Sequence, residues 1–172
     1  IEPKYAVITS IGPQHLSTFK KMDNIIKEKM SLVEMLPHDG LAVLNKDNVY
    51  INEYVVKNDV RCVSYGIMNT DVDYFADNLK YSIEGSTFDV NYKDETYEFK
   101  TRLLGEHNVL NILSAIALGR ELGITWEKLQ TAVRNVKFIE HRLELKTING
   151  RTFIDNAFNS NPEGAKMPLK VV

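Results

Sequence analysis

The 172-residue chain contains a single cysteine, Cys62. One thiol cannot build a framework of internal disulfides, so a disulfide-rich secreted scaffold is excluded and a reducing compartment is expected. No apolar run approaches the roughly 18 residues that a membrane-spanning helix needs. The formal net charge is only −2, which gives no strong attraction to nucleic acid or to an anionic membrane. We therefore expect a cytoplasmic protein with neither nucleic-acid binding nor membrane insertion.

The sequence also lacks the common nucleotide-binding loops. Neither G-x-x-x-x-G-K-[ST] nor G-x-G-x-x-G occurs in it, and it has no cysteine pair that could hold a metal ion. The order of the residues gives no sign of a Ser-His-Asp or Cys-His arrangement. Its 44% hydrophobic and 26% charged residues are ordinary for a folded domain. The function must therefore be sought in local motifs.

Hydrophobic periodicity predicts an α/β fold. Apolar runs at 5–11, 41–44 and 61–67 alternate with helical patterns at 22–36 and 48–57. Strands that alternate with helices in this way are typical of a parallel sheet flanked by helices.

Near residue 71 the pattern changes from long apolar runs to alternation of apolar and polar residues. Three such runs, at 81–83, 87–92 and 97–103, are separated by turn-forming residues. They predict an antiparallel β meander added to the edge of the parallel sheet. Two helices are expected to follow, at 108–122 and 126–136.

A domain boundary is expected near residues 138–140, which divides the chain into 1–138 and 139–172. Beyond it, apolar-rich runs at 143–148 and 152–154 flank an Asn-Gly pair, a strong signal for a β-hairpin. An Asn-Pro pair then begins a helix just before the chain stops. We therefore expect the chain to be part of a longer protein.

Polar side chains follow the ends of the predicted strands, where open α/β sheets bind their ligands. His15 comes after the first strand and could hold a metal ion or phosphate, or it could be an ordinary surface histidine. Lys29 lies on an amphipathic helix beside Lys27 and Glu28. Its spacing alone favours a solvated helix face.

Further polar residues open a helix or flank the predicted hairpin. Asn108 and Asn111 share one helix face, and their amides suit the edge of an adenine or, alternatively, helix capping. Arg142 could hold phosphate oxygens or pair with a neighbouring glutamate. Asp155 and Asn156 begin a run of residues that are also typical of a plain turn. Each of these signals is weak on its own.

Taken together and in this order, these segments resemble the Mur ligase family over essentially the whole chain. The residues that carry the resemblance are 6–16, 105–117, 141–144 and 155–162. The tail at 158–167 favours the MurF type within the family. The resemblance implies the later part of the central ATPase domain, without its P-loop, and then the first hairpin and helix of a Rossmann-like C-terminal domain.

The resemblance also implies an activity. MurF-type enzymes use ATP and Mg²⁺ to join D-alanyl-D-alanine to a UDP-MurNAc-tripeptide through an acyl phosphate. By resemblance, His15 and Lys29 are catalytic and hold the metal ion, Lys29 as a carbamate. The resemblance places five residues at the nucleotide: Asn108, Asn111, Arg142, Asp155 and Asn156. Asn156 stands where the family usually has an acid, and it keeps an acceptor but loses the charge.

Two alternatives remain open. The parent protein could be another Mur ligase or a folylpolyglutamate-synthase-like enzyme, or it could be a non-catalytic nucleotide-binding module. The missing P-loop and Asn156 both fit the last alternative. If the parent is a MurF-like ligase, we expect the chain alone not to turn over ATP, because it has no P-loop to hold the phosphates. Its exposed edges could allow self-association.

Overall fold

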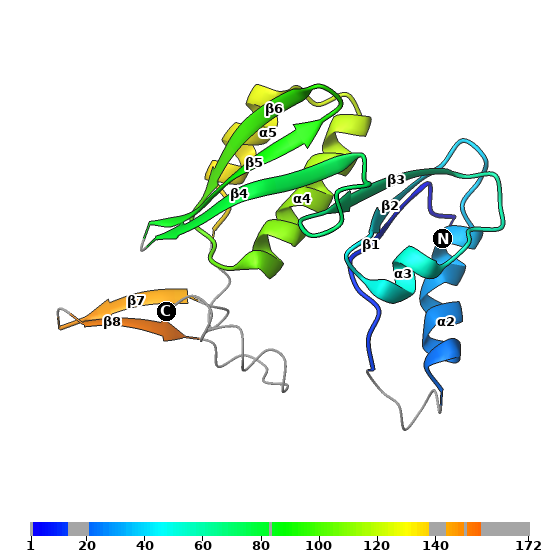
Figure 1. Ribbon diagram of the computed structural model, residues 1–172, viewed down its shortest axis with the longest axis horizontal. Coiled ribbons are helices and arrows are strands. Elements are labelled where there is room, and N and C mark those ends of the chain that lie inside the picture. Colours follow the sequence, from blue (N-terminus) through cyan, green and yellow to red (C-terminus); the bar gives the residue numbers. More distant parts are fainter. Residues whose placement is uncertain (1, 14–20, 83, 138–143, 150, 156–172) are drawn as a thin grey trace.

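The computed structural model describes residues 2–13, 21–82, 84–137, 144–149 and 151–155. In this part of the chain, a six-stranded sheet in the order β1-β2-β3-β4-β5-β6 is flanked by helices (Figure 1). A separate two-stranded sheet, β7-β8, follows. The predicted fold class, a parallel sheet flanked by helices with an added antiparallel meander, is confirmed.

The parallel part contains three strands that pair in chain order: β1 (Tyr5–Ile8), β2 (Leu41–Asn45) and β3 (Arg61–Gly66). Helices α2 (Met22–Glu34) and α3 (Val49–Glu53) connect them and pack against one face of the sheet. β2 is buried along its whole length, as expected for a strand that is covered on both faces.

Helix α3 ends at Glu53, although its pattern predicted a helix to residue 57. The carboxylate of Glu34 accepts the backbone N–H groups of Lys57 at 3.1 Å and Asn58 at 3.2 Å. These donors are therefore bound by a side chain from α2 instead of by carbonyls of a continued helix. A tertiary contact of this kind overrides local helix propensity.

The antiparallel part contains β4 (Tyr74–Ser82), β5 (Gly85–Tyr92) and β6 (Glu95–Thr101). β4 begins beside the end of β3 and runs parallel to it, so the prediction of a strand only at 81–83 was wrong. A register shift follows Asp77, and Asn78 has a positive φ of 49°. This bulge breaks the alternation by which a strand is recognised in sequence.

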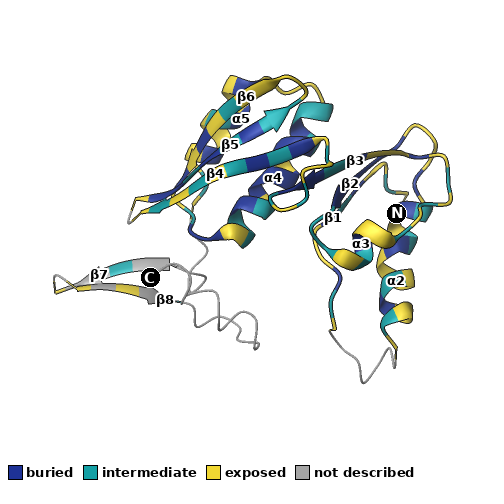
Figure 2. Ribbon diagram, in the orientation of Figure 1, coloured by how far each residue is buried: buried dark blue, intermediate teal, exposed yellow. Residues whose placement is uncertain are grey.

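Helices α4 (Glu106–Glu121) and α5 (Trp126–Arg134) cover the opposite face of the sheet and share a core with its strands. The buried residues of these elements are dark blue in Figure 2. Trp126 of α5 stacks on Tyr97 of β6 with ring centroids 4.0 Å apart. Gly123 lies between the two helices with φ of +85°. Glycine in this conformation ends a helix with little strain.

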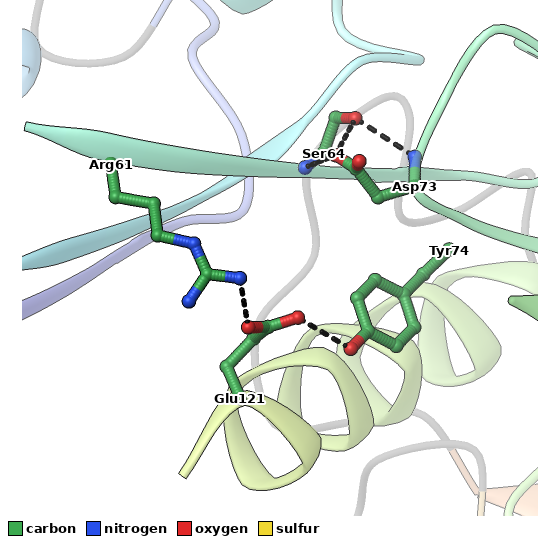
Figure 3. Close-up of polar contacts among 5 residues, drawn as sticks. All are labelled: Arg61, Ser64, Asp73, Tyr74 and Glu121. Atoms are coloured by element: carbon green, nitrogen blue, oxygen red, sulfur yellow. Dashed lines mark hydrogen bonds and ion pairs between the residues drawn. The ribbon is translucent and has the colours of Figure 1, made fainter. Parts of the chain in front are cut away.

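A buried carboxylate, Glu121, ties the end of α4 to the sheet (Figure 3). Its side chain is 8% exposed, pairs with Arg61 at 2.5 Å and accepts the Tyr74 hydroxyl at 2.8 Å. Nearby, Asp73 accepts the Ser64 hydroxyl at 2.6 Å. Because Glu121 ends α4 and Arg61 begins β3, the helix runs antiparallel to the strand, and its first turn points toward the carboxyl ends of the parallel strands.

Tyr74→Phe is expected to lower the free energy of unfolding by about 1–3 kcal/mol, because it removes a donor from a buried carboxylate. Burial and the bond to Glu121 raise the pKa of Tyr74, so the hydroxyl keeps its proton across the physiological range. Urea denaturation measures the change. Tyr97→Phe is the matched control, because that hydroxyl bonds the exposed Glu95. Equal destabilisation by the two variants would contradict a special role for the Tyr74–Glu121 contact.

The hairpin beyond residue 143 consists of β7 (Glu144–Ile148) and β8 (Arg151–Asp155). Asn149 in its turn has φ of +50°, as the predicted Asn-Gly turn requires, while Gly150 lies outside the described residues. The helix predicted to start at Pro162 also lies outside them. Within the described part of the chain, no helix is long and apolar enough to cross a membrane.

Candidate functional site

The candidate site lies at the edge of the sheet where the parallel strands have their carboxyl ends. The end of β1 and the first turn of α4 lie on this same side of the molecule (Figure 1). Thr9 and Ser10 follow β1 and are exposed. Open α/β sheets bind their ligands at this edge.

Lys29 faces a cavity beside the end of β1. We call it the Lys29 cavity; it has a volume of about 280 Å³ and is lined by Val7, Ile8, Thr9, Ser10, Glu28, Lys29 and Leu32. The structure therefore places Lys29 beside Thr9 and Ser10, in the loop that leads toward His15. The spacing of the sequence alone did not predict this placement. His15 itself lies outside the described residues. Lys29 is itself exposed on α2, so the alternative of a solvated helix face also agrees with this placement, and the metal-binding role stays a prediction.

The polar groups of the Lys29 cavity are mostly oxygens: the hydroxyls of Thr9 and Ser10 and the carboxylate of Glu28. Mg²⁺ prefers oxygen ligands, but one carboxylate and two hydroxyls beside the Lys29 ammonium do not form a magnesium site by themselves. An ammonium at Lys29 would repel the cation, whereas a carbamate would add two more oxygens. Among the described residues, no group of three or more His, Cys, Asp and Glu side chains is placed to hold a metal ion. A magnesium ion here would therefore depend on a modified Lys29 and on residues such as His15.

The first turn of α4 presents a second set of polar groups. Gly105 is the N-cap, with φ of 90° and no capping side chain, so the capping alternative for Asn108 does not hold. Asn108 instead donates its side-chain amide to the Leu104 carbonyl at 2.8 Å. Asn111 is exposed one turn further along. The Nδ1 atom of His107 is buried and has no hydrogen-bond partner among the described residues.

The exposed amide of Asn111 offers both a donor and an acceptor, as the edge of an adenine requires. The Nδ1 atom of His107 is buried, so a ligand at the first turn of α4 does not reach it in this structure. Asn108, whose amide is fixed by Leu104, would contribute its remaining oxygen. Sequence reasoning assigned a nucleotide contact to the two asparagines and none to His107, which opens the same helix.

Folding is expected to be sensitive to acid through His107. Burial lowers the pKa of His107 below the ordinary value of 6.5, and Glu106 opposes this shift only in part. The unfolded chain therefore takes up a proton that the folded chain resists, so stability should fall as the pH drops below 6.5. His107→Gln should remove this loss of stability. Urea denaturation between about pH 5 and 8 measures the free energy of unfolding at each pH. His38→Gln, at an exposed position, is the control, and an unchanged profile in His107→Gln would contradict the assignment.

The other predicted site residues lie near or beyond the hairpin. Asp155 is half-buried at the end of β8, and its carboxylate pairs with Lys146 at 2.6 Å across the hairpin. That carboxylate is thus already bound within its own sheet. Arg142 and Asn156 lie outside the described residues, so their expected nucleotide contacts stay predictions.

Sequence reasoning missed the turn that follows β2. Asp47 accepts the backbone N–H groups of Ile67, Met68 and Asn69 at 2.7, 3.0 and 2.8 Å. One carboxylate thereby joins the carboxyl ends of β2 and β3. The signal was the run of turn-forming residues at 45–48, directly after an apolar strand.

Comparison with known proteins finds the same family in sequence. A model of the Mur ligase middle domain matches residues 1–119. A UDP-N-acetylmuramate–L-alanine ligase from Dictyoglomus turgidum is 34% identical over 150 residues, 86% of this chain and 32% of that protein. A UDP-N-acetylmuramoyl-L-alanyl-D-glutamate–2,6-diaminopimelate ligase from Chlamydia muridarum is 35% identical over 139 residues, 80% of this chain and 29% of that protein. The chain thus spans about a third of the length of these curated relatives.

A solved structure has the same fold. The MurF ligase of Thermotoga maritima, determined in complex with ADP, matches with a TM-score of 0.85 over 98% of this chain and 39% of that one. The two sequences are 19% identical, so the match shows a common fold and does not distinguish one ligase type from another.

Proposed function

The chain belongs to the Mur ligase family, and from this we propose that it forms part of the ATP-dependent site of an amide ligase that builds peptidoglycan precursors. The proposal rests on one observation: Lys29 lines the same cavity as Thr9 and Ser10 at the carboxyl edge of the sheet. We assign residues 1–138 to the later part of the central domain and 139–172 to the start of the C-terminal domain. A cytoplasmic location, where ATP is available, agrees with the single cysteine.

The proposed reaction has two steps. A carboxylate oxygen of the peptide substrate attacks the γ-phosphorus of ATP, and ADP leaves. The incoming amine then attacks the acyl carbon, so that a C–N bond forms while the C–O bond to phosphate breaks, and phosphate and a proton are released. Mg²⁺, when bound, neutralises charge on the transferred phosphoryl group.

In this proposal the residues of the chain bind and orient the reactants. His15 and a carbamylated Lys29 would hold the metal ion at the carboxyl edge. Asn108 and Asn111 would hold the adenine at the start of α4. Arg142 and Asn156 of the second domain would add contacts when the two domains close. Asp155 would have to leave its ion pair with Lys146 to reach the nucleotide.

The amine substrate is a finer part of the proposal. The tail at 158–167 favours D-alanyl-D-alanine as the amine and a UDP-MurNAc-tripeptide as its acceptor, as in the MurF type. The curated relatives are named for the addition of L-alanine or diaminopimelate. These two amines, each with its own UDP-MurNAc acceptor, are therefore the second candidates.

The test uses the full-length protein that contains this chain. Phosphate release from ATP and Mg²⁺ is followed with UDP-MurNAc-tripeptide and D-alanyl-D-alanine, and each component is omitted in turn. We expect release only when both substrates are present. Release with L-alanine or diaminopimelate and the matching acceptor would move the protein to a sister type, and no release with any pair would contradict the ligase proposal. The 172-residue chain alone should release no phosphate, and robust release by it would contradict the need for a separate phosphate loop.

A further inference from the structure

The six-stranded sheet has a gap beside the first half of β3. β2 pairs with residues 61–65 of this strand, but β4 pairs only with its last two residues, Tyr65 and Gly66. Among the described strands, residues 61–63 therefore have no partner on the side of β4. A cavity of about 450 Å³ occupies the gap, and we call it the β3-edge cavity; it is lined by residues 61–63, 72–73, 92–93 and 121. It lies at the amino ends of the parallel strands, at the opposite edge of the sheet from the Lys29 cavity.

The backbone of Cys62 faces the β3-edge cavity. Along a strand, alternate residues direct their N–H and C=O groups to the same side. The carbonyl of Tyr65 points toward β2, because it accepts the N–H of Lys46 at 2.9 Å. The N–H of Ser64 points the other way and donates to the carboxylate of Asp73 at 2.7 Å. Cys62 lies two residues before Ser64, so its N–H and C=O groups point into the gap, where an extended peptide could bind them as an added strand.

Three charged groups at the walls of the cavity still have bonding capacity. Arg61 donates one Nη atom to Glu121 (Figure 3), and its other nitrogens make no hydrogen bond within the described part of the chain. Lys93 has no ion pair with any described residue, and its ammonium lies 5.1 Å from the centroid of the Tyr92 ring. Asp73 uses only its Oδ2 atom in contacts with described residues, which leaves Oδ1 for a ligand.

The charges at the walls select a zwitterion over a simple anion. Two cations, Arg61 and Lys93, are matched by two carboxylates, Asp73 and Glu121. A phosphate or a lone carboxylate would meet both signs of charge, and like charges brought together weaken binding. A ligand with a carboxylate at one end and an ammonium at the other can pair each end with an opposite charge.

The dimensions of the cavity fit a short peptide. The three residue steps from Arg61 to Ser64 cover roughly 10 Å at about 3.3 Å per residue, which is the length of an extended dipeptide or tripeptide. The volume lies within the range of small-molecule sites, about 300–1,000 Å³. Val63, Val72 and the ring of Tyr92 add apolar walls, which suit small apolar side chains.

We propose that the β3-edge cavity binds a short peptide with free amino and carboxyl ends, which lies beside β3 as an added strand. Its carboxylate pairs with Arg61 and Lys93, its ammonium pairs with Oδ1 of Asp73, and one of its peptide groups bonds the backbone of Cys62. The peptide runs antiparallel to β3, because Arg61 begins the strand and Asp73 lies beside its fourth residue. Glu121 is a positioning residue, which holds the guanidinium of Arg61 at the cavity. This site goes beyond the proposed ligase function and does not depend on it.

The first experiment measures binding of the dipeptide L-alanyl-L-valine to the full-length protein by isothermal titration calorimetry. Its C-terminal amide and its N-acetyl form each lack one charged end, and we expect both to bind about tenfold or more weakly. Lys93→Asn should weaken binding of the free dipeptide about threefold or more. Asparagine tolerates the φ of +55° at residue 93, so this variant removes the charge without straining the turn. Lys80→Asn is the control, because Lys80 is exposed on β4 and does not line the cavity.

A second variant tests the guanidinium. Arg61→Lys keeps a cation beside Glu121 but loses the planar fork of donors that can bind two partners at once. We expect it to weaken binding of the dipeptide about tenfold, while the melting temperature stays near that of the wild type. Affinity equal to the wild type in both Arg61→Lys and Lys93→Asn would overturn the proposal, as would equal binding of the free and blocked dipeptides.

Hydrogen exchange locates the bound peptide. Saturating L-alanyl-L-valine should slow exchange of the Cys62 N–H several-fold in the wild type, because that group gains an acceptor, and should slow it less in Lys93→Asn. Inorganic phosphate should leave this exchange unchanged. Unaltered exchange at Cys62 with bound dipeptide would overturn the added strand, and equal slowing by phosphate would mean a simple anion site and would overturn the peptide. Neither measurement requires turnover, so the outcome does not depend on the ligase activity.

Discussion

Lys29→Ala is expected to lower turnover of the full-length ligase by about 100-fold or more. A metal ion that stabilises transferred charge contributes several kcal/mol to the transition state, and each 1.36 kcal/mol corresponds to about a tenfold change in rate. Lys29 lines the cavity at the end of β1, so its loss removes the proposed carbamate from that position. Steady-state phosphate release with saturating substrates measures the effect.

Lys27→Ala is the matched control for this prediction. Lys27 is exposed on the same helix and does not line the Lys29 cavity, so its removal should leave turnover unchanged. A carbamate forms when the neutral lysine amine adds to CO₂ and releases a proton. Depletion of CO₂ and bicarbonate should therefore lower the activity of the wild type, and added bicarbonate should restore it. Equal activity of Lys29→Ala and Lys27→Ala would contradict a catalytic role for Lys29.

Gly85→Ala is expected to destabilise the fold by about 3 kcal/mol or more. Gly85 starts β5 with φ of +129°, and an added Cβ would meet the carbonyl oxygen of Thr101 and lie 2.7 Å from the Cα of Arg102. Backbone strain of this kind costs about 1–3 kcal/mol, and overpacking against a fixed neighbour adds about 1–3 kcal/mol. Because the clash involves the backbone of the next strand, side-chain rotation cannot relieve it. Urea denaturation with a constant m-value measures the loss.

Gly123→Ala separates the cost of the backbone conformation from the cost of the steric clash. Gly123 also has a positive φ, +85°, but an added Cβ there would meet nothing within 4 Å. This variant should therefore lose about 1–2 kcal/mol from the backbone conformation alone. If Gly85→Ala cost no more than Gly123→Ala, the close approach of β5 to Thr101 would not be the source of the strain.

Much of the fold could be predicted because its signals are local. The helical spacing of Ile25, Met30 and Val33 identified α2, and all three are buried. The glycine after α4 has the positive φ that its position implied. The start of β4 could not be found in the same way, because Asn78 sits in a bulge that interrupts the alternation. The end of α3 depends on Glu34, a residue of another helix.

The candidate site was harder to predict because its contacts are distant in sequence. Lys29 was singled out by resemblance alone, since the spacing of its helix favoured a solvated face. Only the fold shows that the lysine shares a cavity with Thr9 and Ser10. The hydrogen bond from the side-chain amide of Asn45 to the carbonyl of Thr9 leaves no local pattern, because a polar residue at a strand end is equally typical of a plain turn.

The measurement that tests the central claim most directly is transfer of ¹⁸O from the peptide carboxylate to phosphate. The full-length protein is given ATP, Mg²⁺, the amine and a UDP-MurNAc-peptide whose terminal carboxylate carries ¹⁸O, and the released phosphate is examined by mass spectrometry. An acyl phosphate retains the bridging carboxylate oxygen on phosphorus when the amine displaces phosphate, so the account predicts one ¹⁸O atom in the phosphate from each turnover of labelled carboxylate. Phosphate without ¹⁸O would mean that water attacks ATP directly, and it would contradict the assignment of this chain to the site of an amide ligase.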